Sequence, residues 1–162
     1  MAGSNTAFTP DMILYRLAAL KYAQDLTGEG SRLYGGRWNL PGTPCIYTAE
    51  NRALAVLEYS VNVDLHLIPR TLQIIQLQVP DDSITICNIP DLPGNWKDVP
   101  APAHTQRFGS RLLQAKETLM IKVPSTVVPQ EFNFLINPLH PGMQQVRVLA
   151  IEDFVYDPRI KQ

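Results

Sequence analysis

The sequence has little of several features that would reveal a function directly. Its 162 residues include two cysteines and three scattered histidines, too few for a disulfide framework and without the spacing of a metal site. The net charge is −1, so no broad basic surface is available for DNA or RNA. No apolar run approaches the length of a membrane span. We therefore expect no metal centre, no direct nucleic acid binding and no membrane association.

The N-terminal stretch MAGSNTAFTPDM lacks the basic region and apolar run of a signal peptide. Cys45 and Cys87 each lie in an apolar, strand-like stretch, and two such cysteines make no disulfide framework. Free thiols are typical of proteins in a reducing compartment. These features favour a cytoplasmic protein.

What the chain does contain is the composition of an ordinary globular protein, with 45% hydrophobic and 18% charged residues. Its length suits one domain with a sizeable core. No internal repeat, linker or low-complexity tract divides it. We therefore expect a single domain over residues 1–162.

Periodicity separates the chain into short strands and a few helices. Strands are expected at residues 12–17, 44–49, 70–79, 83–89, 118–124, 132–138 and 146–156, and helices at 51–62 and 104–117. Residues 18–43 are expected to be mostly irregular, and so long a loop is usually functional. Because strands and helices do not alternate regularly, the pattern indicates an α+β domain with a compact mixed sheet.

Two charged residues stand in apolar surroundings. The expected helix at 51–62, with Thr48 as its cap, has an apolar face made of Ala53, Leu54, Leu57 and Val61. Glu58 lies at the edge of this face, where it either reaches solvent or faces an internal cleft that also holds an arginine. Arg16, within the apolar stretch ILYRLA, needs an anion, which would be Glu58 or a ligand.

The stretch YGGRWNLPG, residues 34–42, places Arg37 directly after two glycines. Glycines permit positive φ and close backbone approach, and a rigidly held guanidinium suits a phosphate or carboxylate. Two phosphate-binding motifs fail on spacing, because Leu33 replaces the third glycine of a dinucleotide fingerprint and Gly36 and Arg37 replace the lysine and hydroxyl residue of a P-loop. The loop is expected to lead to a strand rather than to open a helix. The alternative is a tight turn in which Arg37 pairs with a surface carboxylate.

Two further polar residues have an ordinary structural explanation. Ser125 follows an expected strand in the stretch VPSTVVP, where a hydroxyl commonly bonds its own backbone in a turn. Tyr47 lies on an expected strand, where packing is the usual role of an aromatic ring. Neither residue indicates a function by itself.

Five blocks of the chain, taken together, closely resemble the RES domain family, the toxins of RES–Xre toxin–antitoxin modules. The blocks are LYRLA, GGRWNLPGTPCIYTAE, ALAVLEYSV, VPSTVVPQEFNFLINPLHP and FVYDPR. The resemblance runs over residues 12–159. It implies a fold related to that of ADP-ribosyltransferases and an activity on NAD, mostly its degradation. Matched block by block, the arginine, glutamate and serine that give the family its name are Arg16, Glu58 and Ser125.

The resemblance implies NAD as a substrate rather than a cofactor. Arg37 would bind the pyrophosphate through a two-point contact, and Arg16 would serve the same anion or the phosphate on the nicotinamide ribose. Cleavage of the nicotinamide–ribose bond leaves an oxocarbenium-like sugar, which the Glu58 carboxylate would stabilise. Tyr47 would stack on the nicotinamide ring, and Ser125 would hydrogen-bond a ribose or amide group.

Three outcomes share this machinery and differ in the acceptor. Water gives a glycohydrolase, phosphate gives a phosphorylase, and a protein side chain gives an ADP-ribosyltransferase. A non-catalytic member that only binds its antitoxin is the remaining alternative. The resemblance favours NAD depletion, and it implies a cognate Xre-type antitoxin that blocks the enzyme and carries the DNA-binding part.

Overall fold

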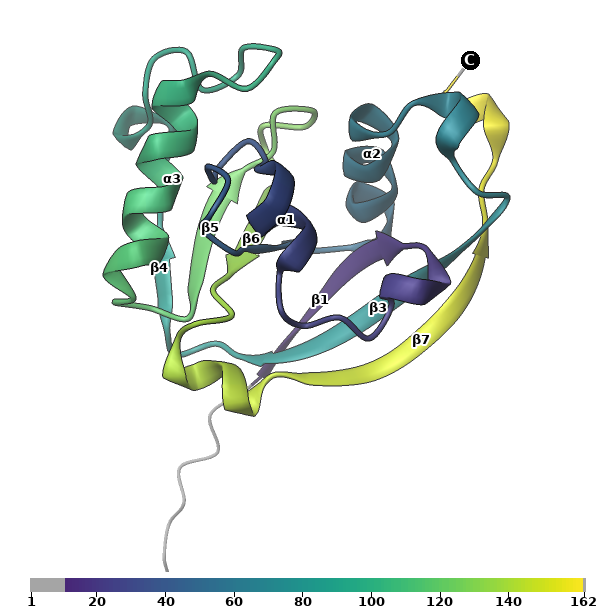
Figure 1. The fold of residues 1–162 in the computed structure, drawn as a ribbon, viewed down its shortest axis with the longest axis horizontal. Coiled ribbons are helices and arrows are strands. Elements are labelled where there is room, and N and C mark those ends of the chain that lie inside the picture. The colour runs from purple at the N-terminus through teal and green to yellow at the C-terminus, as the bar shows by residue number, and fades with distance from the viewer. Residues whose placement is uncertain (1–10, 162) are drawn as a thin grey trace, which may run out of the picture.

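The computed structural model describes residues 11–161 and contains one mixed sheet, three α-helices and several short 3-10 turns (Figure 1). The strands are β1 Asp11–Ala18, β2 Ile46–Ala49, β3 Thr71–Pro80, β4 Ile84–Ile86, β5 Met120–Pro124, β6 Phe132–Ile136 and β7 Arg147–Val155. The helices are α1 Glu29–Tyr34, α2 Arg52–Asn62 and α3 Ala103–Ala115. The N-terminal stretch 1–12, in which we expect no signal peptide, lies mostly outside the described residues. The predicted α+β class with a mixed sheet is confirmed.

The sheet has the strand order β4-β5-β6-β2-β1-β3-β7. All neighbouring strands run antiparallel except β4 and β5. Strand β1 pairs with β3 along its whole length, from Asp11 to Ala18, but with β2 at one register position, where Tyr15 lies opposite Ala49. The two halves of the sheet are therefore joined by a short ladder in its middle.

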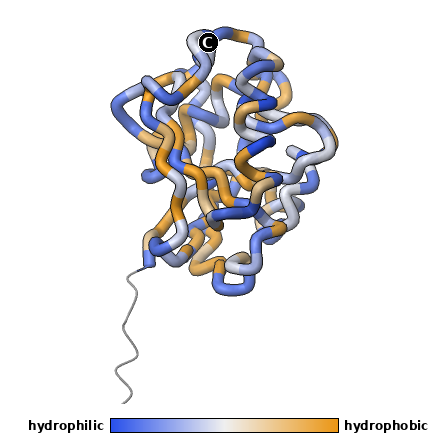
Figure 2. The backbone as a smooth tube through the Cα atoms, turned by 90° about the vertical axis from the view of Figure 1, so that its left-hand side faces the viewer, coloured by the Kyte–Doolittle hydropathy of each residue, from blue (hydrophilic) through white to orange (hydrophobic). Residues whose placement is uncertain are grey.

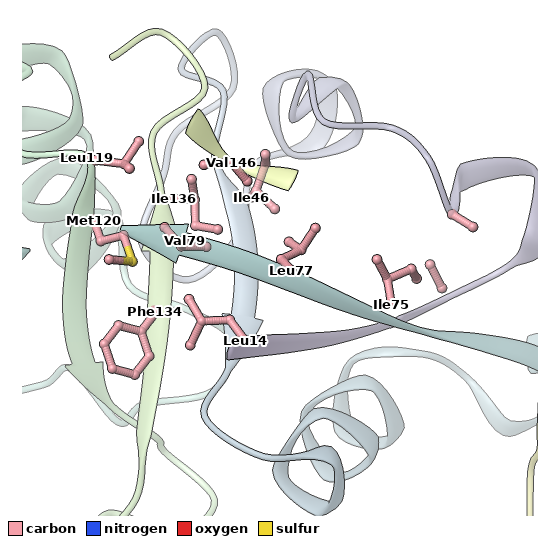
Figure 3. Packing of buried hydrophobic residues seen from close by; sticks show 12 residues of the cluster. Leu14, Ile46, Ile75, Leu77, Val79, Leu119, Met120, Phe134, Ile136 and Val146 are labelled. Carbon is pink, nitrogen blue, oxygen red and sulfur yellow. The ribbon is translucent and has the colours of Figure 1, made fainter. Parts of the chain in front are cut away.

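The helices cover different parts of the sheet. Figure 1 shows α3 beside β4 and β5 at one end and α2 near the end of β1, with α1 between them. The main core is built by apolar side chains of the central strands, as Figure 3 shows for Leu14, Ile75, Leu77, Phe134 and Ile136. Figure 2 colours the backbone by hydropathy: hydrophobic residues are concentrated along strands inside the molecule, and hydrophilic residues are frequent in the outer loops.

A second apolar cluster anchors α3 and the loop before it. Trp38 stacks on Trp96, with ring centroids 6.2 Å apart, and contacts Phe108 from α3. The backbone of Gly109 lies so close to Trp38 that a Cβ atom there would stand 1.9 Å from the Trp38 carbonyl oxygen. Only glycine fits at this crossing. The loop that follows α1 is thus fixed against α3.

Several local predictions are wrong. The stretch 18–43 contains the short helix α1, for which Gly28 is the N-cap in the left-handed conformation, whereas the glycine loop that follows α1 leads to β2 as expected. Helix propensity is low there because Gly28 and Gly35 flank the helix and Gly30 lies inside it. The expected strand at 83–89 is ordered as β4 over only three residues.

The N-terminus and buried face of α2 also differ from expectation. Asn51 caps the helix by accepting a hydrogen bond from the Leu54 N–H, whereas the Thr48 hydroxyl lies on β2 and donates to the Phe134 carbonyl. Ala53 and Val61 are exposed, and the buried positions are Leu54, Ala55, Val56 and Ser60. The helix is therefore rotated relative to the predicted face, which turns Glu58 inward.

Candidate active site

A cavity of about 630 Å³ opens where the two halves of the sheet meet. Its walls come from the end of β1, from β2, from α1 with the loop before it, and from the inner side of α2. Arg16, Tyr47 and Glu58 line this cavity, whereas Ser125 and Arg37 do not. The volume falls within the range of small-molecule sites.

Glu58 is the carboxylate that α2 presents to the cavity. Its Oε1 atom accepts two hydrogen bonds, one from the Ser125 hydroxyl at 2.6 Å and one from the Asn133 amide at 2.8 Å. Within residues 11–161, no hydrogen bond reaches Oε2. Two donors on the same oxygen fix the orientation of the carboxylate and leave its other oxygen available to a ligand.

Ser125 lies at the end of β5, fully buried and 67 positions from Glu58 in the sequence. Besides donating to Glu58, its hydroxyl oxygen accepts the backbone N–H groups of Val127 at 3.0 Å and Val128 at 3.1 Å. The expected turn hydroxyl is thus present, whereas the contact with Glu58 was not predicted from the sequence. Its contacts are with the protein rather than with the cavity.

Asn133 lines the cavity and was missed by the sequence reasoning. It lies on β6 opposite Ala49 of β2. The signal that singled out Glu58 and Arg16, a polar side chain within an apolar stretch, was also available in FNFLI. That signal would have identified Asn133 as a candidate, although not its contact with Glu58.

Arg16 enters the cavity from β1, and its Nη1 atom donates to the backbone carbonyl of Asp25 at 2.8 Å. Burial lowers the pKa of Arg16, an effect that the nearby Asp25 carboxylate partly opposes. Among residues 11–161 it forms no ion pair with Glu58. Glu58 is therefore not its ion-pair partner in the described residues, and an anionic ligand for Arg16 stays a prediction.

Tyr47 is held rigidly at the cavity wall. Its hydroxyl donates to Oδ1 of Asn39 at 2.5 Å and accepts the Trp38 N–H at 3.0 Å. A Cβ atom at Gly36 would stand 2.6 Å from this hydroxyl, which explains the second glycine of the loop. Burial raises the pKa of Tyr47 well above its usual value, so the phenol stays neutral.

Arg37 lies behind the cavity wall. Its Nη1 atom donates to the carbonyls of Trp96 and Asp98, both at 2.8 Å, and it forms no ion pair with a carboxylate in the described part of the chain. The alternative in which Arg37 pairs with a surface carboxylate is therefore wrong, and its contact with a pyrophosphate stays a prediction. Partial burial lowers the pKa of Arg37, while the charges of Glu58 and other neighbours oppose this shift. Arg37 ties the loop after α1 to the loop before α3.

No group of three potential metal ligands occurs among residues 11–161. His140 accepts a hydrogen bond from the Gly142 N–H, and His66 and His104 are exposed. None of the helices between residues 11 and 161 is long and apolar enough to cross a bilayer.

A family model named RES domain matches residues 13–157. The chain belongs to the RES domain family. This agrees with the resemblance of the five sequence blocks, and it covers nearly all of the described residues.

The RES chain has curated relatives that are named as toxins. It is 38% identical over 155 residues to "Toxin Res" of Yersinia enterocolitica, covering 93% of this chain and 100% of the relative. It is 36% identical over 141 residues to "Prs ADP-ribosylating toxin" of Sphingobium sp. (strain YBL2), covering 85% of this chain and 88% of the relative.

The fold of the RES chain also matches a solved structure. The M. tuberculosis MbcT–MbcA toxin–antitoxin complex contains a chain that aligns with a TM-score of 0.72 at 18% sequence identity. The alignment covers 94% of this chain and 87% of that chain. This likeness bears out the predicted ADP-ribosyltransferase-like fold.

Proposed function

We propose that this RES protein is the toxin of a toxin–antitoxin module and that it consumes NAD by breaking the nicotinamide–ribose bond. The observation that supports this most strongly is Glu58, a cavity carboxylate with one oxygen held by two donors and the other without a hydrogen bond in the described residues. Such an oriented charge stabilises a developing cation without having to reorganise.

The chemistry suits a site without a general acid. When the bond between ribose C1 and the pyridinium nitrogen breaks, its electron pair leaves with nicotinamide, which becomes neutral, and the sugar takes on oxocarbenium character. Glu58 stabilises that positive charge through Oε2. An acceptor then adds to C1. Water yields ADP-ribose and a proton, whereas inorganic phosphate yields ADP-ribose phosphorylated at C1.

The other cavity residues would bind the substrate. Arg16 would pair with a phosphate of NAD, since within residues 11–161 its guanidinium hydrogen-bonds only to a backbone carbonyl. The fixed ring of Tyr47 would stack on nicotinamide. Ser125 would act by holding Glu58, because its hydroxyl is spent on that contact and on two backbone groups. Arg37, predicted to bind the pyrophosphate, does not line the cavity, and its Nη1 atom already donates to two carbonyls, so such a contact would have to come from Nε and Nη2.

A protein acceptor is the second candidate. One relative, 36% identical, is named as an ADP-ribosylating toxin. The same cavity and the same carboxylate would serve that reaction, because only the nucleophile differs. The product would be a protein carrying ADP-ribose, with nicotinamide again released.

We also propose that a cognate antitoxin of the Xre type covers the cavity. A structurally similar chain is found in a toxin–antitoxin complex. Three cavity-lining apolar side chains remain exposed here, namely Tyr22 at 50%, Leu33 at 51% and Tyr34 at 83%. Exposed apolar side chains grouped at a cavity are typical of a protein-binding surface. Coexpression with the neighbouring gene product, followed by hydrogen exchange, should show protection at residues 22–34 and loss of NAD turnover. Protection confined to other faces with unchanged turnover would contradict this placement.

Product analysis tests the reaction. The purified protein is incubated with NAD in phosphate-free buffer, in phosphate buffer, and with a bacterial lysate. Free nicotinamide should form in at least one condition. ADP-ribose, its C1 phosphate, or a labelled protein band then identifies the acceptor as water, phosphate or protein. If no condition releases nicotinamide from NAD, the chain is a non-catalytic member and the proposal is wrong.

A further inference from the structure

The side chain of Asn133 makes one hydrogen bond to a carboxylate and has one buried acceptor atom without a partner in the described residues. Its Nδ2 donates to Oε1 of Glu58 at 2.8 Å, while its Oδ1 is buried and has no hydrogen-bond partner within residues 11–161. Buried side-chain acceptors are normally paired, and an unpaired one destabilises the fold. The arrangement therefore needs an explanation.

The contact with Glu58 explains the orientation of the amide. If the Asn133 amide were turned over, its oxygen would face the carboxylate oxygen at the distance that Nδ2 now occupies, and two acceptors would repel. The orientation that lets Nδ2 donate to Glu58 therefore leaves Oδ1 of Asn133 without a hydrogen bond in the described residues. It makes no other side-chain hydrogen bond in the described part of the chain, whereas Ser125 also holds two backbone groups.

We propose that Asn133 is a positioning residue for the reaction of Glu58. It holds Oε1 from β6 while Ser125 holds the same oxygen from the end of β5. Together they direct Oε2 toward the substrate. The amide supplies a donor that carries no charge, so the negative charge of Glu58 is kept for the transition state. This role rests on the proposed NAD cleavage.

Other charged groups around Glu58 are common to every variant described below. Arg37 acts on it electrostatically from the loop after α1. The cavity also contains Arg16 from β1, Tyr47 from β2, Tyr59 from α2, and Asp25 and Glu29 from the α1 region. Because kcat of each variant is compared with that of the wild type at the same pH, titration of these groups cancels to first order.

Two substitutions separate positioning from packing. Asn133→Leu keeps the approximate volume and removes the donor at every pH. Asn133→Asp keeps the shape, and its carboxyl group can donate to Oε1 only while it is protonated; once ionised, it repels Glu58. Asn137→Asp is the matched control, because Asn137 is buried just after the same strand and donates to the Leu113 carbonyl at 2.7 Å, away from the cavity.

The measurement is kcat for nicotinamide release between about pH 5.5 and pH 8.5, with the melting temperature of each variant as a check of folding. Asn133→Leu should lose about 10- to 100-fold in kcat at every pH, as expected for one charged hydrogen bond. Asn133→Asp should retain more activity at the acidic end and lose about tenfold relative to the wild type as the pH rises. Asn137→Asp should lower the melting temperature alone.

Wild-type kcat in both Asn133 variants at every pH would overturn the positioning role, and so would parallel, pH-independent losses. If the wild type itself releases no nicotinamide, the proposed function fails first, and the positioning role is judged by unfolding. A double-mutant cycle of Asn133→Leu with Glu58→Ala should then show a coupling of about twofold or more in the unfolding equilibrium constant. Additive effects would refute the contact itself.

Discussion

Replacing Ser125 by alanine should impair both stability and catalysis, because its hydroxyl joins the end of β5 to the carboxylate of α2. The substitution removes one charge-assisted hydrogen bond to Glu58 and two bonds from the N–H groups of Val127 and Val128. A charged hydrogen bond contributes roughly 1.5–3 kcal/mol and a neutral one about 1 kcal/mol. Val127 is 38% exposed, so water can replace part of the loss.

We therefore expect Ser125→Ala to lower the free energy of unfolding by about 2–3 kcal/mol, or the melting temperature by roughly 4–12 °C in a chain of this size. The loss of orientation at Glu58 should lower kcat by about 10- to 100-fold. Ser110→Ala is the control, since this buried hydroxyl accepts a single bond, from the Leu40 N–H at 2.8 Å. Ser110→Ala should lower the free energy of unfolding by about 1 kcal/mol and leave kcat unchanged. Equal stability losses, with full activity in Ser125→Ala, would refute the reasoning.

Three further predictions concern other parts of the molecule. Arg16→Lys should raise KM for NAD more than for nicotinamide mononucleotide, which lacks the pyrophosphate, because lysine cannot make a planar two-point contact. Arg37→Lys should do the same only if Nε and Nη2 of Arg37, which the two carbonyls leave free, reach the pyrophosphate. Equal effects on both substrates would exclude a pyrophosphate contact. Lys161→Met should lower the melting temperature by a few degrees without changing kcat, since Lys161 donates to two carbonyls at the end of α2; an unchanged melting temperature would show that this cap contributes nothing. Burial raises the pKa of Cys87 to about 11 and that of Cys45 further, so both thiols should resist a thiolate-specific reagent at pH 8, and rapid labelling of the native protein would contradict their burial. The free energy of unfolding should fall as the pH rises above about 9, because there only the thiols of the unfolded chain ionise.

The sequence was sufficient for the fold class and most strands because their signals are local. Alternating apolar residues at 70–79 predicted β3, and the apolar stretch at 44–49 predicted β2, each within two residues of its observed bounds. The position of α3 was found in the same way. Helix α1 was missed because six residues with an internal glycine have little helical propensity and are ordered by tertiary contacts.

The site was predictable residue by residue but not as an arrangement. Glu58 and Arg16 stood out as charges in apolar stretches, and both line the cavity. Their pairing, one of two alternatives for Arg16, does not occur in the described residues. The sequence could not decide this, because the position of Glu58 depends on how α2 is rotated over the sheet. The contact of Glu58 with Ser125 spans 67 residues and that with Asn133 spans 75, and no local pattern encodes such distances.

The central claim is that the Glu58 carboxylate drives cleavage of the nicotinamide–ribose bond, and nicotinamide release by Glu58→Gln tests it most directly. Glutamine keeps the shape and can accept the same bonds from Ser125 and Asn133, so the melting temperature should change little while kcat falls by about 100-fold or more. The matched control is Glu117→Gln, at an exposed position outside the cavity, which should release nicotinamide at the wild-type rate. Wild-type release by Glu58→Gln, in a folded protein, would contradict the account.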